Sequence, residues 1–168
     1  MLRLRPYKRT DADIIAGWIK DEVTFRKWCA LEYESYPITG EDINRYYDES
    51  YEFHDDLYEF TAFDEDGPVG HFTLRLADEK KTVAKLGFVL VDGEKRGRGY
   101  GREMLKLAMK YAFELLKAER MTLLVFENNV NAYGLYSSMG FRVVEGVDKS
   151  LKFFGERWRG VEMEAFPG

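Results

Sequence analysis

Three alternating glycines among arginines form the segment of this chain best suited to chemistry. The segment runs Arg96, Gly97, Arg98, Gly99, Tyr100, Gly101 and Arg102. An apolar stretch precedes it, and apolar residues at helical spacing follow it from Met104 to Leu116. Glycines free backbone N–H groups, and the first turn of a helix presents more of them. This strand-to-helix junction therefore predicts a binding site for a phosphate or pyrophosphate.

Three known patterns place glycines after a strand, as at this junction. A Walker loop ends in Gly-Lys-Ser/Thr, whereas Gly101 is followed by Arg102. A dinucleotide fingerprint needs a third glycine at the position of Arg102. The third pattern, Arg/Gln-x-x-Gly-x-Gly/Ala, is matched in full by Arg96, Gly99 and Gly101.

A second motif follows after one helix and one strand. It consists of Asn129, Ala132, Leu135, Tyr136, Gly140 and Phe141. Together the two motifs resemble those of the GNAT superfamily of acetyl-CoA-dependent N-acetyltransferases, and the close match covers residues 83–144. The resemblance implies one domain over residues 1–168 with a layered α/β (α+β) fold. Its mixed, mostly antiparallel sheet has about six to seven strands flanked by helices, with a central parallel βαβ unit splayed to admit acetyl-CoA.

The resemblance also implies a set of cofactor-binding residues. They are Leu90, Val91, Arg96, Gly97, Arg98, Gly99, Tyr100, Gly101, Arg102, Asn129 and Ala132. The pyrophosphate would lie on the loop amides, and the pantetheine arm would lie beside the preceding strand. A backbone N–H near Leu90 or Val91 would hold the thioester oxygen and stabilise the oxyanion that develops during attack. Asn129 is expected to cap the next helix as well.

Tyr136 is the candidate general acid, because it lies one helical turn from Ala132 and a phenol with a pKa of ~10 keeps its proton at neutral pH. Many relatives place a glutamate on the strand before the loop, but residues 85–91 contain none. Water-assisted deprotonation is therefore favoured, with Glu127 as the named candidate base, acting directly or through water. His71 titrates near neutrality but is expected to be structural.

The predicted function is transfer of an acetyl group from acetyl-CoA to a primary amine by direct attack in a ternary complex. Small amines, antibiotics, polyamines and protein N-termini all stay open as acceptors. Four carboxylates either attract a cationic amine or form solvated surface: Glu32, Glu34, Asp55 and Asp56. Two alternatives remain, a non-catalytic acyl-CoA-binding or regulatory module on the same fold and a nicotinamide-dependent oxidoreductase.

The bulk composition limits the partners. A net charge of -5 argues against a general nucleic-acid or anionic-membrane binder, and no segment predicts a signal peptide or membrane span. One cysteine and two histidines predict no disulfide and no metal centre, and hence a reducing, cytoplasmic setting. Aromatic residues make up 15% of the chain, which is compatible with a homodimer interface.

The local patterns predict the elements that position these residues. Alternation and helical spacing give strand 2–5, a helix capped by Thr10, helices 22–28 and 41–49, strands 58–63 and 68–76, strand 83–91, helix 101–117, strand 121–126, helix 130–139, and strands 141–144 and 161–166. Strand, helix and strand between residues 83 and 126 predict a parallel crossover unit.

Overall fold

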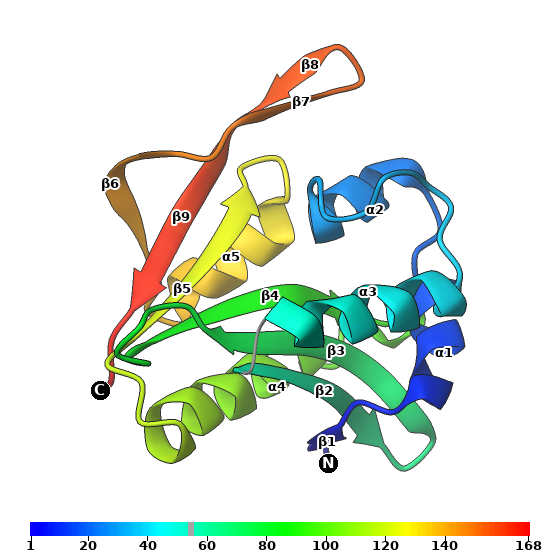
Figure 1. Cartoon of the computed structure of the whole chain (residues 1–168), viewed down its shortest axis with the longest axis horizontal. Helices are drawn as coiled ribbons and strands as arrows, with labels where there is room; N and C mark the ends of the chain where they lie inside the picture. Colours follow the sequence, from blue (N-terminus) through cyan, green and yellow to red (C-terminus); the bar gives the residue numbers. More distant parts are fainter. Residues whose placement is uncertain (54–55) are drawn as a thin grey trace.

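A computed structural model describes residues 1–53 and 56–168 of the chain (Figure 1). A seven-stranded sheet has the order β1-β2-β3-β4-β5-β9-β6, and β7 pairs with β8 in a separate hairpin. The strands are β1 (Arg3–Pro6), β2 (Leu57–Asp64), β3 (Gly67–Leu76), β4 (Val83–Val91), β5 (Arg120–Phe126), β6 (Arg142–Asp148), β7 (Leu151–Phe153), β8 (Glu156–Trp158) and β9 (Gly160–Ala165). Among the described strands of this sheet, β4 and β5 are the one parallel pair, which confirms the predicted mixed sheet.

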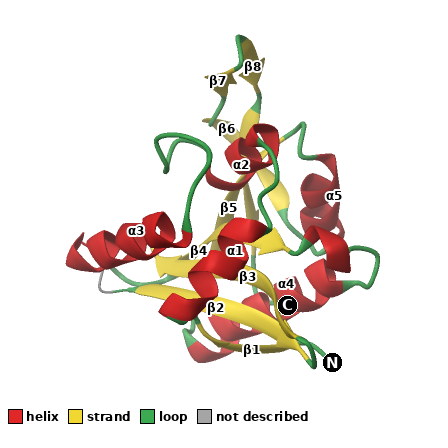
Figure 2. Ribbon diagram, turned by 90° about the vertical axis from the view of Figure 1, so that its right-hand side faces the viewer, coloured by secondary structure: helices red, strands yellow, loops and turns green. Residues whose placement is uncertain are grey.

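Helices cover both faces of this sheet (Figure 2). They are α1 (Ala12–Gly17), α2 (Glu22–Cys29), α3 (Gly40–Phe53), α4 (Tyr100–Lys110) and α5 (Val130–Ser138), with short turns η1 (Arg9–Asp11), η2 (Gly93–Lys95) and η3 (Tyr111–Leu115). The helices α1 to α3 share one hydrophobic core, whereas α4 and α5 pack with the sheet in another. None of the described helices combines the length and the hydropathy needed to cross a bilayer.

The two cores follow from the alternation of side chains along the strands. In β4, Ala84 and Leu86 are buried against the α4 side, so Lys85 between them points to the other face. In α4, Met104, Leu105 and Ala108 are buried at helical spacing. Polar side chains from the middle of the sheet, such as Lys85, therefore lie on the face that α1, α2 and α3 cover.

Two predicted boundaries were wrong. Thr10 does not cap a helix, because it lies within η1 and the α-helix begins only at Ala12. The reason is that Asp11 turns inward, where its carboxylate accepts hydrogen bonds from Arg5 and Thr61. The helix expected over 101–117 is regular only to Lys110 and continues as one π turn, η3.

The hairpin of β7 and β8 was not predicted, and β6 extends beyond residue 144. Gly155, with a φ of 75°, makes the turn between β7 and β8. Phe153 and Trp158 then pack on Phe126 at the end of β5 and form a small third core. This contact ties the hairpin to the strand that borders the candidate site.

Candidate active site

The parallel pair β4–β5 separates part-way along its length. Hydrogen-bonded pairing ends at Lys85 and Thr122, although β4 continues to Val91 and β5 to Phe126. Over this stretch β5 pairs only along its other edge, with β9. The edge of β4 beyond Lys85 consequently has no strand partner on the β5 side, which leaves backbone groups that an extended ligand can pair with.

A β-bulge lies in this same part of β4. Phe88 has a φ of 50°, and the register with β3 shifts between Thr73–Gly87 and His71–Leu90. A positive φ is uncommon for a non-glycine residue, and a bulge bends its strand. Sequence analysis missed this feature, although Gly87 inside a strand was an available signal for a bulge.

A cavity of about 700 Å³ borders the bulge and the separated strands. Its walls come from β4, the glycine-rich loop, β5 and α5. The structure brings together nine of the predicted cofactor-binding residues along it: Leu90, Val91, Arg96, Gly97, Gly99, Tyr100, Gly101, Asn129 and Ala132. Tyr136 lines it too, whereas Arg98 and Arg102 do not.

The glycine-rich loop carries free hydrogen-bond donors. No acceptor within residues 1–53 and 56–168 takes the backbone N–H groups of residues 96–99. Gly97 and Gly99 have φ values of 78° and 76°, and Gly99 precedes α4 without a capping side chain. Unpaired N–H groups at a helix N-terminus fit a pyrophosphate group.

The arginines of the loop differ in what they contact. Arg96 lines the cavity, where its guanidinium suits a phosphate oxygen. Arg102 instead donates a hydrogen bond to Ser138 Oγ at 2.8 Å and so joins α4 to α5. Lys95, which sequence analysis did not assign, also lines the cavity. The tyrosine between the arginines, Tyr100, donates to Asp64 at 2.8 Å and anchors the start of α4 to β2.

The second motif presents its residues along α5. Ala132 and Tyr136 line the cavity one turn apart, as predicted from their spacing. Tyr136 is 6% exposed, and burial raises its pKa above the ordinary value, so the phenol keeps its proton. Asn129 precedes α5 but makes no side-chain cap hydrogen bond. The expected capping role of the Asn129 side chain is therefore wrong, and Asn129 instead lines the cavity.

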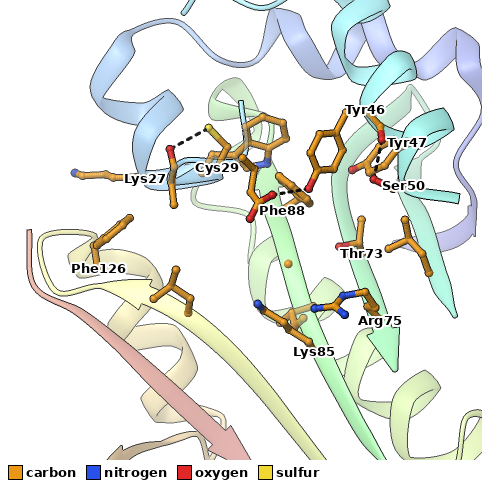
Figure 3. A pocket seen from close by; sticks show the side chains of 17 residues that line it. Lys27, Cys29, Tyr46, Tyr47, Ser50, Thr73, Arg75, Lys85, Phe88 and Phe126 are labelled. Atoms are coloured by element: carbon orange, nitrogen blue, oxygen red, sulfur yellow. Dashed lines mark hydrogen bonds between the residues drawn. The ribbon is translucent and has the colours of Figure 1, made fainter. Parts of the chain in front are cut away.

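A second cavity of about 270 Å³ lies on the α1–α3 side of β4 (Figure 3). It shares Trp28 and Phe88 with the first cavity, so the two meet at the bulge. Its charged lining residues are Lys27, Glu32, Arg75 and Lys85. Tyr46 donates a hydrogen bond from its hydroxyl to Glu32 at 2.7 Å. The smaller cavity can hold the amine that accepts the acetyl group, and the larger cavity can hold the acetyl donor.

The structure does not bring Glu127 into either cavity. Its Oε1 accepts a hydrogen bond from Arg159 Nη1 at 2.8 Å, and neither cavity includes it in its lining. His71 is also set apart, because it is fully buried in β3. The geometry therefore does not favour Glu127 as the base.

The four carboxylates that could attract a cationic amine lie in different places. Glu32 lines the second cavity and Glu34 lines neither. Asp56 accepts a hydrogen bond from Lys81 at 3.1 Å. Asp55 lies outside the described residues.

Comparison with known proteins agrees with this geometry. The family model of the GNAT acetyltransferases matches residues 25–141. This chain belongs to the GNAT acetyltransferase family. The family match spans β4, the glycine-rich loop, β5 and α5, all of which line the larger cavity.

Two curated relatives come from Bacillus subtilis. A spermine/spermidine N(1)-acetyltransferase from strain 168 and a probable spermine N(1)-acetyltransferase from the natto strain BEST195 are each 35% identical to this GNAT chain over 80 residues. The match covers 48% of this chain and 50% of each relative. The chain thus spans about half the length of the curated relatives it matches.

Solved structures show the same fold. Spermidine N-acetyltransferase from Vibrio cholerae, in complex with CoA and spermine, superposes with a TM-score of 0.80 at 20% identity, over 98% of this chain and 95% of that one. A putative phosphinothricin N-acetyltransferase superposes with a TM-score of 0.76 at 18% identity, over 99% and 98%. The predicted GNAT-like fold is confirmed.

Proposed function

We propose that the chain transfers the acetyl group of acetyl-CoA to a primary amine by direct attack in a ternary complex. The observation that carries this proposal is the unpaired edge of β4 beyond Lys85, which leads to a loop with free N–H groups at residues 96–99. Coenzyme A carries a pyrophosphate and an arm with peptide-like amides, and it can use both features at once. Membership of the GNAT acetyltransferase family supports the same activity.

Different residues of the larger cavity bind different parts of coenzyme A. The loop amides and Arg96 hold the pyrophosphate, and the edge of β4 pairs with the pantetheine arm. The arm then directs the thioester toward the bulge at Phe88, where the two cavities meet. A backbone N–H near Leu90 or Val91 donates to the thioester oxygen and stabilises its developing negative charge.

The reaction needs two proton transfers, one on each side of β4. The amine nitrogen attacks the carbonyl carbon, the C–N bond forms and the C–S bond breaks. The departing sulfur takes a proton from the hydroxyl of Tyr136, which burial keeps protonated, and Tyr136 regains a proton from water before the next turnover. On the acceptor side the amine loses its proton to water, and Glu32 is the described carboxylate that lines this cavity.

Turnover of acetyl-CoA over a panel of primary amines tests the proposal, with released thiol and acetylated amine both measured. The names of the Bacillus relatives place spermidine and spermine on the panel. Thermal shifts with CoA and with NAD run in parallel, because a ligand at 100 times its Kd adds about 2.7 kcal/mol of stability.

Three outcomes separate the proposal from its alternatives. Acetylated product from at least one amine supports an enzyme. CoA binding without turnover across the whole panel supports a non-catalytic acyl-CoA-binding or regulatory module. Stabilisation by NAD, with none by CoA, would contradict both.

A further inference from the structure

Two cations face each other on the sheet that floors the smaller cavity. Arg75 of β3 and Lys85 of β4 are direct cross-strand partners, and both line this cavity (Figure 3). Partners in register share one face of a sheet, and like charges directly opposite one another are destabilising. Lys85 is still exposed to solvent, and its pKa is lowered by partial desolvation first and by the neighbouring charge of Arg75 second.

No salt bridge within the described residues neutralises this pair. Neither side chain makes a salt bridge there. The cavity lining adds a third cation, Lys27, against one carboxylate, Glu32. Glu32 and Glu162 act to raise the pKa of Lys85 and Lys149 acts to lower it, but desolvation and the charge of Arg75 lower it overall. The cavity is therefore positively charged in an acidic protein whose net charge is -5.

Apolar and aromatic side chains also line this cavity. Trp28, Phe88 and Leu124 are among them, and the rings of Trp28 and Phe88 lie 5.2 Å apart. Phe88 marks the bulge that both cavities share, and it lies three steps along the strand from Lys85, a span of roughly 10 Å. A short hydrocarbon chain with a charge at each end matches this order of groups.

We infer that the amine acceptor carries an oxyanion, such as a carboxylate, which binds between Arg75 and Lys85. This inference rests on the proposed acetyl transfer and deepens it. The acceptor's amine then lies toward Phe88 and the carboxylate of Glu32, while its methylene groups contact the aromatic lining. The planar guanidinium of Arg75 suits a carboxylate in two-point contact, and Lys85 adds a point charge.

The same cavity disfavours a polyamine. A second ammonium on the acceptor would lie against Arg75 and Lys85, and like charges repel one another. The acceptor class inferred from this charge pattern therefore differs from the one in the names of the Bacillus relatives.

Matched acceptors that differ only in the group at the far end test the inference. Butylamine, 4-aminobutyrate and 1,4-diaminobutane share one chain length, and hexylamine, 6-aminohexanoate and 1,6-diaminohexane share another. In at least one set, kcat/KM for the carboxylate compound should exceed that for the other two by about ten-fold or more, the effect of one charge-assisted hydrogen bond.

Charge removal links the preference to the two cations. Arg75→Gln and Lys85→Gln should each lower the ratio of kcat/KM for the carboxylate compound over the diamine by about ten-fold. Lys106→Gln, on the exposed side of α4, is the matched control and should leave the ratio unchanged. Affinity for CoA verifies that each variant is folded. An unchanged ratio in both cavity variants would overturn the inference.

Calorimetric titration of the same compounds into the CoA complex separates this inference from the proposed function. If no amine is acetylated but the carboxylate compounds bind more tightly than the diamines, the acetyl transfer fails and the anion preference stands. If the diamines bind or react best, or the three end groups are equivalent, the anion preference is wrong even where acetyl transfer is observed.

Discussion

The hydroxyl of Tyr47 donates a hydrogen bond to Nε2 of His71 at 2.6 Å, deep between α3 and β3. The other ring nitrogen, Nδ1, donates to the carbonyl oxygen of Phe60 at 2.8 Å. Both nitrogens are thus engaged in the neutral tautomer, and burial lowers the pKa of His71 to about 4. His71 therefore links α3 to the sheet as a structural residue, and it does not act as the base.

This arrangement predicts a loss of stability in mild acid. An unfolded histidine has a pKa near 6.5, so between about pH 6.5 and 4 the unfolded chain binds a proton that the folded chain does not. The free energy of unfolding should fall by about 3 kcal/mol as the pH falls through this range. Urea unfolding at several pH values measures the slope.

The carboxylates titrate at the acid end of the same range, so the slope needs a reference. His71→Asn removes the titrating ring and leaves the carboxylates in place. The wild-type chain should lose more stability on acidification than this variant does. Equal slopes would show that His71 is not neutral in the folded state.

A second prediction concerns the buried ion pair beneath α1. Asp11 is 2% exposed and accepts hydrogen bonds from both terminal nitrogens of Arg5, at 2.7 and 2.8 Å. Burial raises the pKa of Asp11, but the hydrogen bonds, first that from Arg5, outweigh burial and lower it overall. Asp11→Ala should cost about 3 kcal/mol, because it leaves the Arg5 charge partly buried without its partner.

The exposed pair of Arg9 and Asp48 provides the control. Its charged atoms also lie 2.8 Å apart, but both side chains are more than half exposed. Asp48→Ala should therefore cost less than about 1 kcal/mol. Urea unfolding of the two variants gives the comparison, and similar losses would mean that burial does not set the strength of the Arg5–Asp11 pair.

The cofactor side of the site could be predicted because its signals are local. Gly97 and Gly99 take the positive φ values that a glycine-rich turn requires. Ala132 and Tyr136 share one face of α5 because four residues make about one helical turn. Neighbours in the sequence decide each of these features, so patterns in the sequence suffice to locate them.

The acceptor side depends on contacts between distant segments. Arg75 and Lys85 face each other only because β3 and β4 pair in one particular register. Glu32 reaches the cavity from the loop after α2, held by Tyr46 of α3. The place of Glu127 at a strand end makes it a candidate base in the sequence, but the distant Arg159 pairs with it. No periodicity in the sequence encodes such pairings.

A third prediction tests the pyrophosphate loop. Gly99 has a φ of 76° and precedes α4. Valine is strained in this backbone region, so Gly99→Val should displace the loop N–H groups and lower the affinity for CoA by at least about ten-fold. Isothermal titration measures the affinity.

Gly155→Val is the matched control, because Gly155 has a φ of 75° in the turn between β7 and β8 and does not line the larger cavity. It should bring similar strain without loss of CoA binding. Unchanged affinity in Gly99→Val, or an equal loss in Gly155→Val, would count against the loop as the phosphate site.

The last prediction concerns Tyr136. Tyr136→Phe removes the hydroxyl while keeping the buried ring, so CoA affinity should persist while kcat falls by about 100-fold or more, the range for a positioned general acid. Tyr133→Phe, on the same helix but outside the cavity lining, should leave kcat unchanged.

Because burial raises the pKa of Tyr136, its acid form persists at alkaline pH. The wild-type kcat should therefore not decline between pH 7 and 10 through loss of this proton, and a decline that disappears in Tyr136→Phe would show that the phenol ionises in this range.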